Sequence, residues 1–297
     1  MKNIIKTTFV NSHNKLRNGW WIAIFIVFVA MTRPIYKPLK LLLDDFGIHA
    51  NILELLSAAL ILFVTYLCVR LRKETMGSVG LDIDSNWMQQ FGLGLGAGLI
   101  MVFGLAATVW LGGGVNFEYN FKLDVSFLLL SFYLFAIGAF FEELLHRGFL
   151  FQRLIGGIGF WPAQLMIASL FAVGHLSNPG MEGVSQIIGA VNLFVSSLVF
   201  GLAYYKTRSL ALPIGLHLGW NWSMGSLLGI NVSGHENAGV LISQISDMPS
   251  WFTGGEFGLE GSVLAIGVEC VALFLLWHWT GTHCSSNASD KIVLKAA

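Results

Sequence analysis

The sequence contains few charged side chains and few cysteines. Asp, Glu, Lys and Arg make up 11% of its 297 residues, whereas about 25% is usual in soluble domains. Hydrophobic residues make up 55%, and this balance indicates an integral membrane protein. The formal net charge is zero, so no basic surface that would bind nucleic acid is expected.

The sequence also lacks two common signatures of metal sites. The three cysteines, Cys68, Cys270 and Cys284, form no Cys-x-x-Cys pair, so neither a disulfide framework nor a thiolate metal site is expected. The His-Glu-x-x-His helix of many zinc peptidases is absent as well. Glycine, by contrast, occurs 34 times, which is ordinary for packed membrane helices.

Eight apolar runs are long enough to cross a bilayer, which takes about 20 residues. They cover 19–43, 51–69, 88–111, 125–155, 161–177, 184–205, 209–230 and 262–280. Charged residues and prolines interrupt the first run, so we expect a short retained helix followed by an interfacial one. The run 125–155 is longer than a perpendicular helix needs, so it must tilt or begin elsewhere. The pattern predicts an all-α polytopic transmembrane helix bundle of about eight helices.

Basic residues are concentrated in alternate segments of this arrangement. With the N-terminus in the cytoplasm, the inside segments hold twelve lysines and arginines, and the outside segments hold only Lys122. This asymmetry fits the positive-inside rule. We therefore expect an integral protein of the inner or plasma membrane with both termini in the cytoplasm. The polar tail 281–297 is expected to be partly disordered.

Four charged or titratable residues interrupt the apolar stretch FFEELLHRGFLF, residues 140–151. A charge at the bilayer centre costs roughly 2.5–3.5 kcal/mol on insertion scales, so such residues usually have a function. On a helix, Glu143 and Arg147 share one face, while Glu142 and His146 share another. One carboxylate can therefore pair with the guanidinium while its neighbour stays available as a general base.

Two further polar clusters lie in other apolar runs. The first is FAVGH, residues 171–175, and the second is HLGWN, residues 217–221. His217 and Asn221 are four residues apart and face one direction. An imidazole and an amide are groups that can donate to a developing oxyanion.

Each cluster also has a structural interpretation. Glu143 and Arg147 can form an ion pair that links helices, and His175 can be a hydrogen-bonded core residue. The amide of Asn221 can join two helices, and Phe171 can serve packing alone. His146 can reach the cytoplasmic headgroups. Three such clusters on three different helices are harder to explain by packing.

The ordered clusters, EExxxR, FxxxH and HxxxN, resemble the motifs of the CAAX-protease and bacteriocin-processing family, which includes abortive-infection-like members. The resemblance covers about 125–230, which would be the catalytic core of a single integral membrane domain, 1–297. Residues 1–110 match only as hydrophobic helices. The stretch GGEFGLEGS, residues 254–262, also resembles a segment before the last helix of bacterial members.

The resemblance implies an intramembrane endopeptidase that acts on a peptide or a lipidated protein among membrane lipids. A glutamate would activate water with the help of one histidine, and a second histidine and an asparagine would stabilise the oxyanion. The implied catalytic residues are Glu142, His175, His217 and Asn221, and the supporting residues are Glu143, Arg147 and Phe171.

Family members have also been described as metalloproteases, so Zn²⁺ stays open as a cofactor. Glu142, His175 and His217 would be the metal ligands, together with a water. Asparagine is a poor zinc ligand, and we favour a glutamate-activated water without a metal.

Helical rise gives the expected depth of these residues. We expect the cytoplasmic helix ends near Arg153, Arg208 and Trp161. Counted from these ends, Glu142 lies about 16 Å deep, His217 about 13 Å and His175 about 21 Å. The sequence therefore predicts a polar catalytic pocket within the membrane, but it places His175 too deep to meet the other two.

Two other classes of function compete with the protease. A bacteriocin-immunity or partner-binding membrane protein could keep the fold without catalysis, although it would not need a complete set of polar clusters. A transporter or proton relay could also use buried Glu, His and Arg, but the sequence has no inverted repeat or pair of broken helices.

Overall fold

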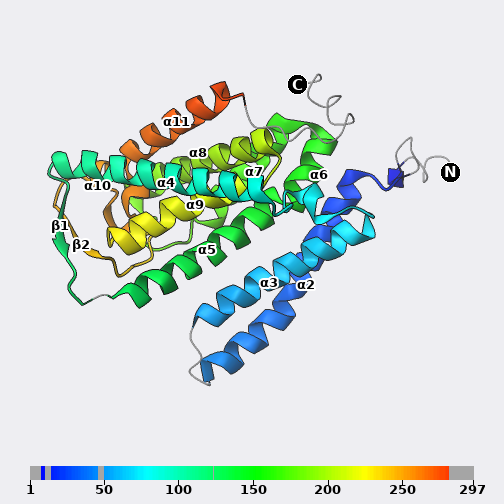
Figure 1. The fold of residues 1–297 in the computed structure, drawn as a ribbon, viewed down its shortest axis with the longest axis horizontal. Coiled ribbons are helices and arrows are strands. Elements are labelled where there is room, and N and C mark those ends of the chain that lie inside the picture. The colour runs from blue at the N-terminus through cyan, green and yellow to red at the C-terminus, as the bar shows by residue number, and fades with distance from the viewer. Residues whose placement is uncertain (1–7, 11–14, 46–49, 123, 281–297) are drawn as a thin grey trace.

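The computed structural model describes residues 8–10, 15–45, 50–122 and 124–280, so the tail 281–297 lies outside the described residues. The helices are α2 (Asn18–Asp45), α3 (Ala50–Leu71), α4 (Ser85–Leu111), α5 (Val125–Arg147), α6 (Phe149–Ile158), α7 (Phe160–Gly174), α8 (Gly183–Thr207), α9 (Ala211–Trp222), α10 (Ser250–Thr253) and α11 (Val263–His278). The strands are β1 (Val115–Tyr119) and β2 (Leu241–Ile245). These elements confirm a helix bundle, drawn in Figure 1.

Five helical stretches in the described part of the chain are long and apolar enough to cross a membrane. They are Asn18–Leu42, Leu53–Leu71, Ser85–Leu111, Val125–Ile158 and Gly183–Thr207. The shorter helices α7 and α11 are apolar too. The protein is therefore a polytopic membrane protein, as its composition indicates.

Helices α2 and α3 extend beyond the rest of the bundle in Figure 1. The expected division of the first run into two helices is wrong, because α2 continues through Pro34 and Pro38. A proline inside a helix leaves a carbonyl without its partner, but membrane helices tolerate this where side chains and neighbouring helices supply others. The prolines were therefore a weaker sign of a helix end than they are in soluble proteins.

The long run 125–155 forms two helices with a break at Gly148. A Cβ atom at this position would collide with the carbonyl oxygen of Leu144, so the turn between α5 and α6 requires glycine. The helical path then continues to Ile158 and reverses at Gly159, which has a φ of 85°. Our expected helix end, near Arg153, was therefore too early.

This longer path removes the mismatch in depth. Glu142 lies 17 residues before Gly159, and His175 lies 16 residues after it. These nearly equal lengths on either side of the turn agree with the observed approach of the two residues, with Glu142 Oε2 3.9 Å from His175 Nε2. The α5–α6 segment and α7 thus carry two polar clusters to one place.

Helix α9 packs closely on α4, and the two lie side by side in Figure 1. Gly94 and Gly98 on α4 face Gly215 and Gly219 on α9, and a Cβ atom at any of the four would collide with the backbone of the partner helix. Such small-xxx-small stripes let membrane helices approach closely. This contact positions the third polar cluster, which lies on α9.

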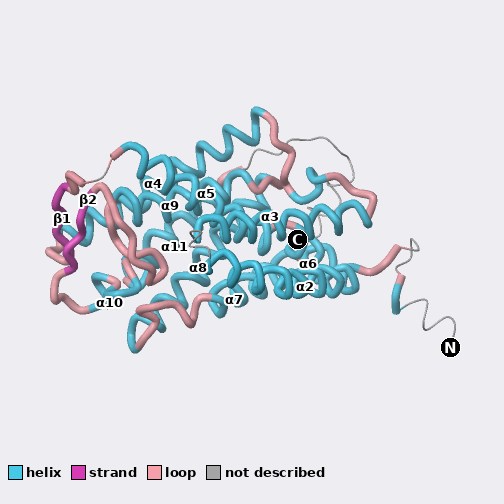
Figure 2. The backbone as a smooth tube through the Cα atoms, turned by 90° about the horizontal axis from the view of Figure 1, so that it is seen from below, coloured by secondary structure: helices cyan, strands magenta, loops and turns pink. Residues whose placement is uncertain are grey.

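A two-stranded antiparallel β-sheet that the sequence analysis did not predict closes one end of the molecule (Figure 2). Strands β1 and β2 are antiparallel, and Val115 pairs with Ile245 while Tyr119 pairs with Leu241. Both strands are five residues long and belong to segments that we interpreted as loops. The segments between α9 and α11 lie at this end and help to enclose the site.

Candidate functional site

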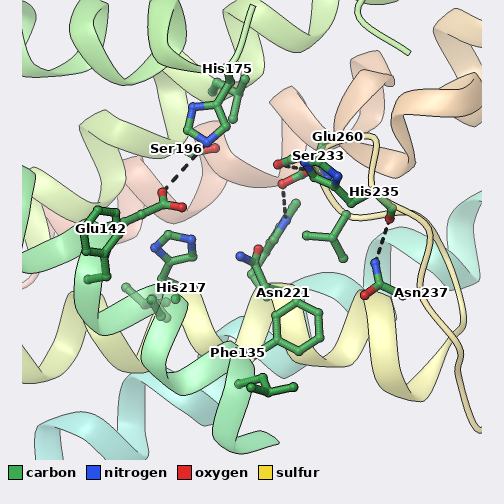
Figure 3. A pocket seen from close by; sticks show the side chains of 18 of the residues that line it. Phe135, Glu142, His175, Ser196, His217, Asn221, Ser233, His235, Asn237 and Glu260 are labelled. Carbon is green, nitrogen blue, oxygen red and sulfur yellow. Dashed lines mark hydrogen bonds and ion pairs between the residues drawn. The ribbon is translucent and has the colours of Figure 1, made fainter. Parts of the chain in front are cut away.

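A cavity of about 780 Å³ lies among α5, α7, α8, α9 and α11 and reaches the loop before β2. Polar and apolar side chains both contribute to its wall, and Figure 3 gives a close view. Five of the seven residues expected in the site line it, namely Glu142, Phe171, His175, His217 and Asn221. The other two, Glu143 and Arg147, have fully buried side chains.

Glu142 and His175 face each other in this cavity, as Figure 3 shows. Glu142 Oε2 lies 3.9 Å from His175 Nε2. His175 Nδ1 lies 2.7 Å from the backbone oxygen of Phe171, which can only accept, so Nδ1 carries the proton. In the neutral imidazole, Nε2 is then an acceptor that points at the carboxylate. Two acceptors separated by this gap suit a bridging water that donates to both.

Glu143 turns away from its neighbour and binds two cationic or titratable groups. Its Oε1 accepts a hydrogen bond of 3.1 Å from Arg147 Nη1 and lies 3.0 Å from His217 Nδ1. The expected pairing of Glu143 with Arg147 is thus present, and Glu142 is left to the cavity. Since a carboxylate accepts, His217 donates through Nδ1. Its ring lines the cavity together with Glu142 (Figure 3).

Arg147 connects this ion pair to α8. Its Nη2 donates to the hydroxyl and the backbone oxygen of Ser197. The guanidinium also lies over the rings of Phe171 and Phe200, with distances of 5.0 and 5.4 Å to the ring centroids. A charge this deeply buried is stable only when partners surround it, and these contacts supply them.

Phe171 is the aromatic centre of the site rather than a peripheral packing residue. Its ring centroid lies 4.6 Å from that of His175, 5.3 Å from that of His146 and 6.3 Å from that of His217. Phe200 stacks on His217 at 5.0 Å with an angle of 13°. The rings therefore restrict the orientation of all three imidazoles.

A third carboxylate, Glu260, joins the cavity to the loop that contains Ser233. It accepts hydrogen bonds from Trp220 Nε1 at 3.1 Å and from Ser233 N and Oγ at 2.6 and 3.0 Å. Burial raises the pKa of Glu260 above its ordinary value, although these donors oppose the shift. Because Trp220 directly precedes Asn221, this contact steadies the end of α9 that carries the amide.

Comparison with known protein families identifies part of the chain. Residues 124–223 match the family model described as type II CAAX prenyl endopeptidase Rce1-like. This segment is similar to the Rce1-like family. It covers about a third of the 297 residues and includes all seven residues expected in the site. At family level the segment is that of a CAAX-type membrane protease. The chain has no significant match among curated proteins or solved structures.

The cavity contains residues inside and outside the Rce1-like segment that our sequence reasoning missed. His146 lines it rather than reaching headgroups, and its Nδ1 lies 2.8 Å from the backbone oxygen of Glu142. His235, to which we assigned no role, lines it too. Glu269 is the sole charged residue of α11, and charge in an apolar helix is a signal that could have found it.

The site does not fit the expected zinc ligands. Within the described residues, no three His, Cys, Asp or Glu side chains form a group that could hold a metal ion. Glu142, His175 and His217 all lie in that part of the chain, and they are not gathered into such a group. The chemistry considered below therefore uses protein side chains and water alone.

Proposed function

We propose that the protein is an intramembrane endopeptidase that hydrolyses peptide bonds near the membrane with water activated by Glu142. The observation that carries this proposal is the Glu142–His175 pair, which presents two acceptors to one point in a partly apolar cavity. General bases need a proton within hydrogen-bond reach, and a water between these two atoms meets that condition. The family match supports the reaction class.

In the proposed reaction, the water donates one hydrogen to Glu142 and the other to His175. Its oxygen attacks the carbonyl carbon of the substrate while Glu142 takes the proton, which forms a tetrahedral intermediate. The carbon–nitrogen bond then breaks as the leaving nitrogen receives this proton from Glu142. The products are a carboxylic acid and an amine, so the atoms of peptide and water balance.

The negative oxygen of the intermediate would be stabilised from α9. The Glu143 carboxylate favours an imidazolium at His217, whose Nε2–H can then donate into the cavity. Asn221 lies one turn further along and also lines the cavity, so its amide is suited to donate beside it. Glu143 and Arg147 act as positioning residues because they hold His217 and the helix that carries Glu142.

The proposed substrate is a peptide segment or a lipidated protein that reaches the cavity from the membrane. We also propose the inner or plasma membrane as the location, with both chain ends at the cytoplasmic face. The distribution of basic residues supports this orientation.

New peptide termini test the proposal directly. Wild type and Glu142→Gln would be expressed in the native membrane, and the termini would be compared by mass spectrometry. Glu236→Gln serves as the matched control, because Glu236 is an exposed carboxylate on the rim of the same cavity. We expect termini that occur with wild type and the control but not with Glu142→Gln. Identical profiles from folded, abundant proteins would instead favour a binding or immunity role.

A further inference from the structure

A second polar cluster joins α8 to α11 in the cavity wall. Ser196 Oγ forms a hydrogen bond with Glu269 Oε1, and both residues line the cavity. The side chain of Glu269 is only 3% exposed, and its Oε2 has no hydrogen-bond partner. A buried carboxylate oxygen without a partner is costly in a membrane protein, so a ligand that supplies a donor would stabilise it.

Asn192 is a second buried residue in this region whose side chain has unmet hydrogen bonds. It precedes Ser196 by one helical turn, and Ser196 Oγ lies 3.0 Å from its backbone oxygen. Asn192 is fully buried, and neither Oδ1 nor Nδ2 of its side chain has a hydrogen-bond partner. Buried polar groups normally have partners. Asn192 does not line the cavity itself, so the unmet hydrogen bond of Glu269 is the one that points to a ligand there.

The charge of the cavity indicates the sign of that ligand. Five glutamates line it, whereas no lysine or arginine does among the residues that the structure describes. These glutamates are Glu54, Glu142, Glu236, Glu260 and Glu269. A recess lined by one sign of charge within apolar walls attracts ligands of the opposite sign.

The other four glutamates of the cavity are less suited than Glu269 to bind a cation deep inside it. Glu260 already accepts from Trp220 and Ser233, and Glu142 faces His175. Glu54 and Glu236 are exposed. Glu269 alone among the five combines a nearly complete burial with a single side-chain donor, the hydroxyl of Ser196.

We infer that Glu269 and Ser196 form a specificity subsite that binds a lysine or arginine side chain of the peptide substrate. This inference rests on the proposed function, because it names a recognition element of the same peptide. The cation donates to Glu269 Oε2, and its charge is neutralised by the carboxylate. The subsite thereby selects peptides with a basic residue near the bond to be cleaved.

Binding to a protein that cannot cleave tests this subsite separately from catalysis. The host is the full chain with Glu142→Gln, purified in detergent. The probes are five myristoylated pentapeptide amides that carry one arginine at successive positions in an alanine–leucine sequence, and five matched peptides with citrulline. Citrulline has nearly the shape of arginine but no charge. We expect roughly ten-fold or stronger preference for arginine at one position, as charge pairing of a buried group gives.

Two further variants locate the preference. Glu269→Gln in the same background should abolish it while the neutral amide keeps the contact with Ser196. Glu236→Gln, which removes a rim carboxylate instead, should retain it. An equal loss in both variants would assign the preference to the general field of the cavity and overturn the subsite. If Glu269→Gln fails to fold, equal affinity for arginine and citrulline in the Glu142→Gln protein still overturns the subsite.

The outcomes separate this inference from the proposed function. Equal affinity for arginine and citrulline at every position overturns the subsite, whatever the termini show. Proteolysis by wild type at sites without enrichment of lysine or arginine would overturn it too, and would leave the endopeptidase standing. Absence of new termini together with a clear arginine preference would instead refute the protease and retain a binding site for basic peptides.

Discussion

The carboxylate of Glu142 and the imidazole of His175 approach to 3.9 Å from two helical segments that reverse at Gly159. His175 contributes through both ring nitrogens, because Nδ1 is anchored on the Phe171 carbonyl oxygen and Nε2 faces the carboxylate. A substitution can remove Nε2 and keep the hydrogen bond that Nδ1 makes. Asparagine retains an N–H near the position of Nδ1 but has no counterpart of Nε2.

For His175→Asn we therefore expect a folded protein whose proteolytic rate falls by about 10² to 10⁴, the range typical of a lost acid–base group. Cleavage would be followed on a substrate found by terminus mapping, together with thermal unfolding in detergent. His235→Asn is the control, because His235 lines the rim of the cavity. Full activity of His175→Asn would remove this histidine from the mechanism.

Arg147→Met should destabilise the protein strongly, because it leaves Glu143 buried without its guanidinium. Removing one member of a buried ion pair costs about 3–5 kcal/mol, and both side chains here are fully buried. The double variant Glu143→Gln with Arg147→Met should recover much of this loss. The fraction folded would be measured in mixed micelles with increasing SDS. Equal instability of the single and double variants would contradict the assigned coupling.

Helical spacing was sufficient to predict the pairs within each polar cluster. Glu143 contacts Arg147 because four residues make about one turn, and the same spacing turns Glu142 toward another face. The sequence could not supply the distances between helices, which depend on where each helix ends. Our placement of His175 too deep arose from an early helix end near Arg153, and the turn at Gly159 corrected it.

Other features needed the structure because no local pattern reveals them. The two strands of the β-sheet are separated by more than a hundred residues, and neither is long enough to stand out from a loop. Glu260 lies in a segment whose resemblance we noticed without assigning it a role, and only its contacts with Trp220 and Ser233 reveal its place. Glu269, in contrast, was visible as a single charge in an apolar helix.

The close contact of α4 with α9 predicts that Gly219→Ala will destabilise the bundle. The new methyl group would collide with the backbone of Leu95, and overpacking of this kind costs about 1–3 kcal/mol. Activity should fall as well, because α9 carries His217 and Asn221. Gly96→Ala is a matched control on α4, since nothing lies within 4 Å of its added methyl group. Equal stability of the two variants would show that α9 can shift without cost.

The last prediction concerns Glu74, which follows α3 and lies outside the membrane-spanning stretches. Its carboxylate pairs with Arg72 at 2.9 Å and with Arg153 at 3.4 Å. Burial raises the pKa of Glu74, but the hydrogen bond from Arg72 and the charge of Arg153 outweigh burial and hold this pKa below its ordinary value. The ion pair of Glu74 with Arg153 joins the end of α3 to α6.

A lowered pKa in the folded state means that the ionised form stabilises the fold. The contribution is complete above the unfolded pKa of about 4.3 and is lost as the pH falls through the lower folded value. Glu74→Gln should therefore cost about 1 kcal/mol near neutral pH, as expected for a partly exposed pair. The difference should vanish in acid, which unfolding measured across this pH range would show. Glu118→Gln controls for loss of an exposed carboxylate, and a Glu74→Gln effect that stays constant in acid would exclude an ionic origin.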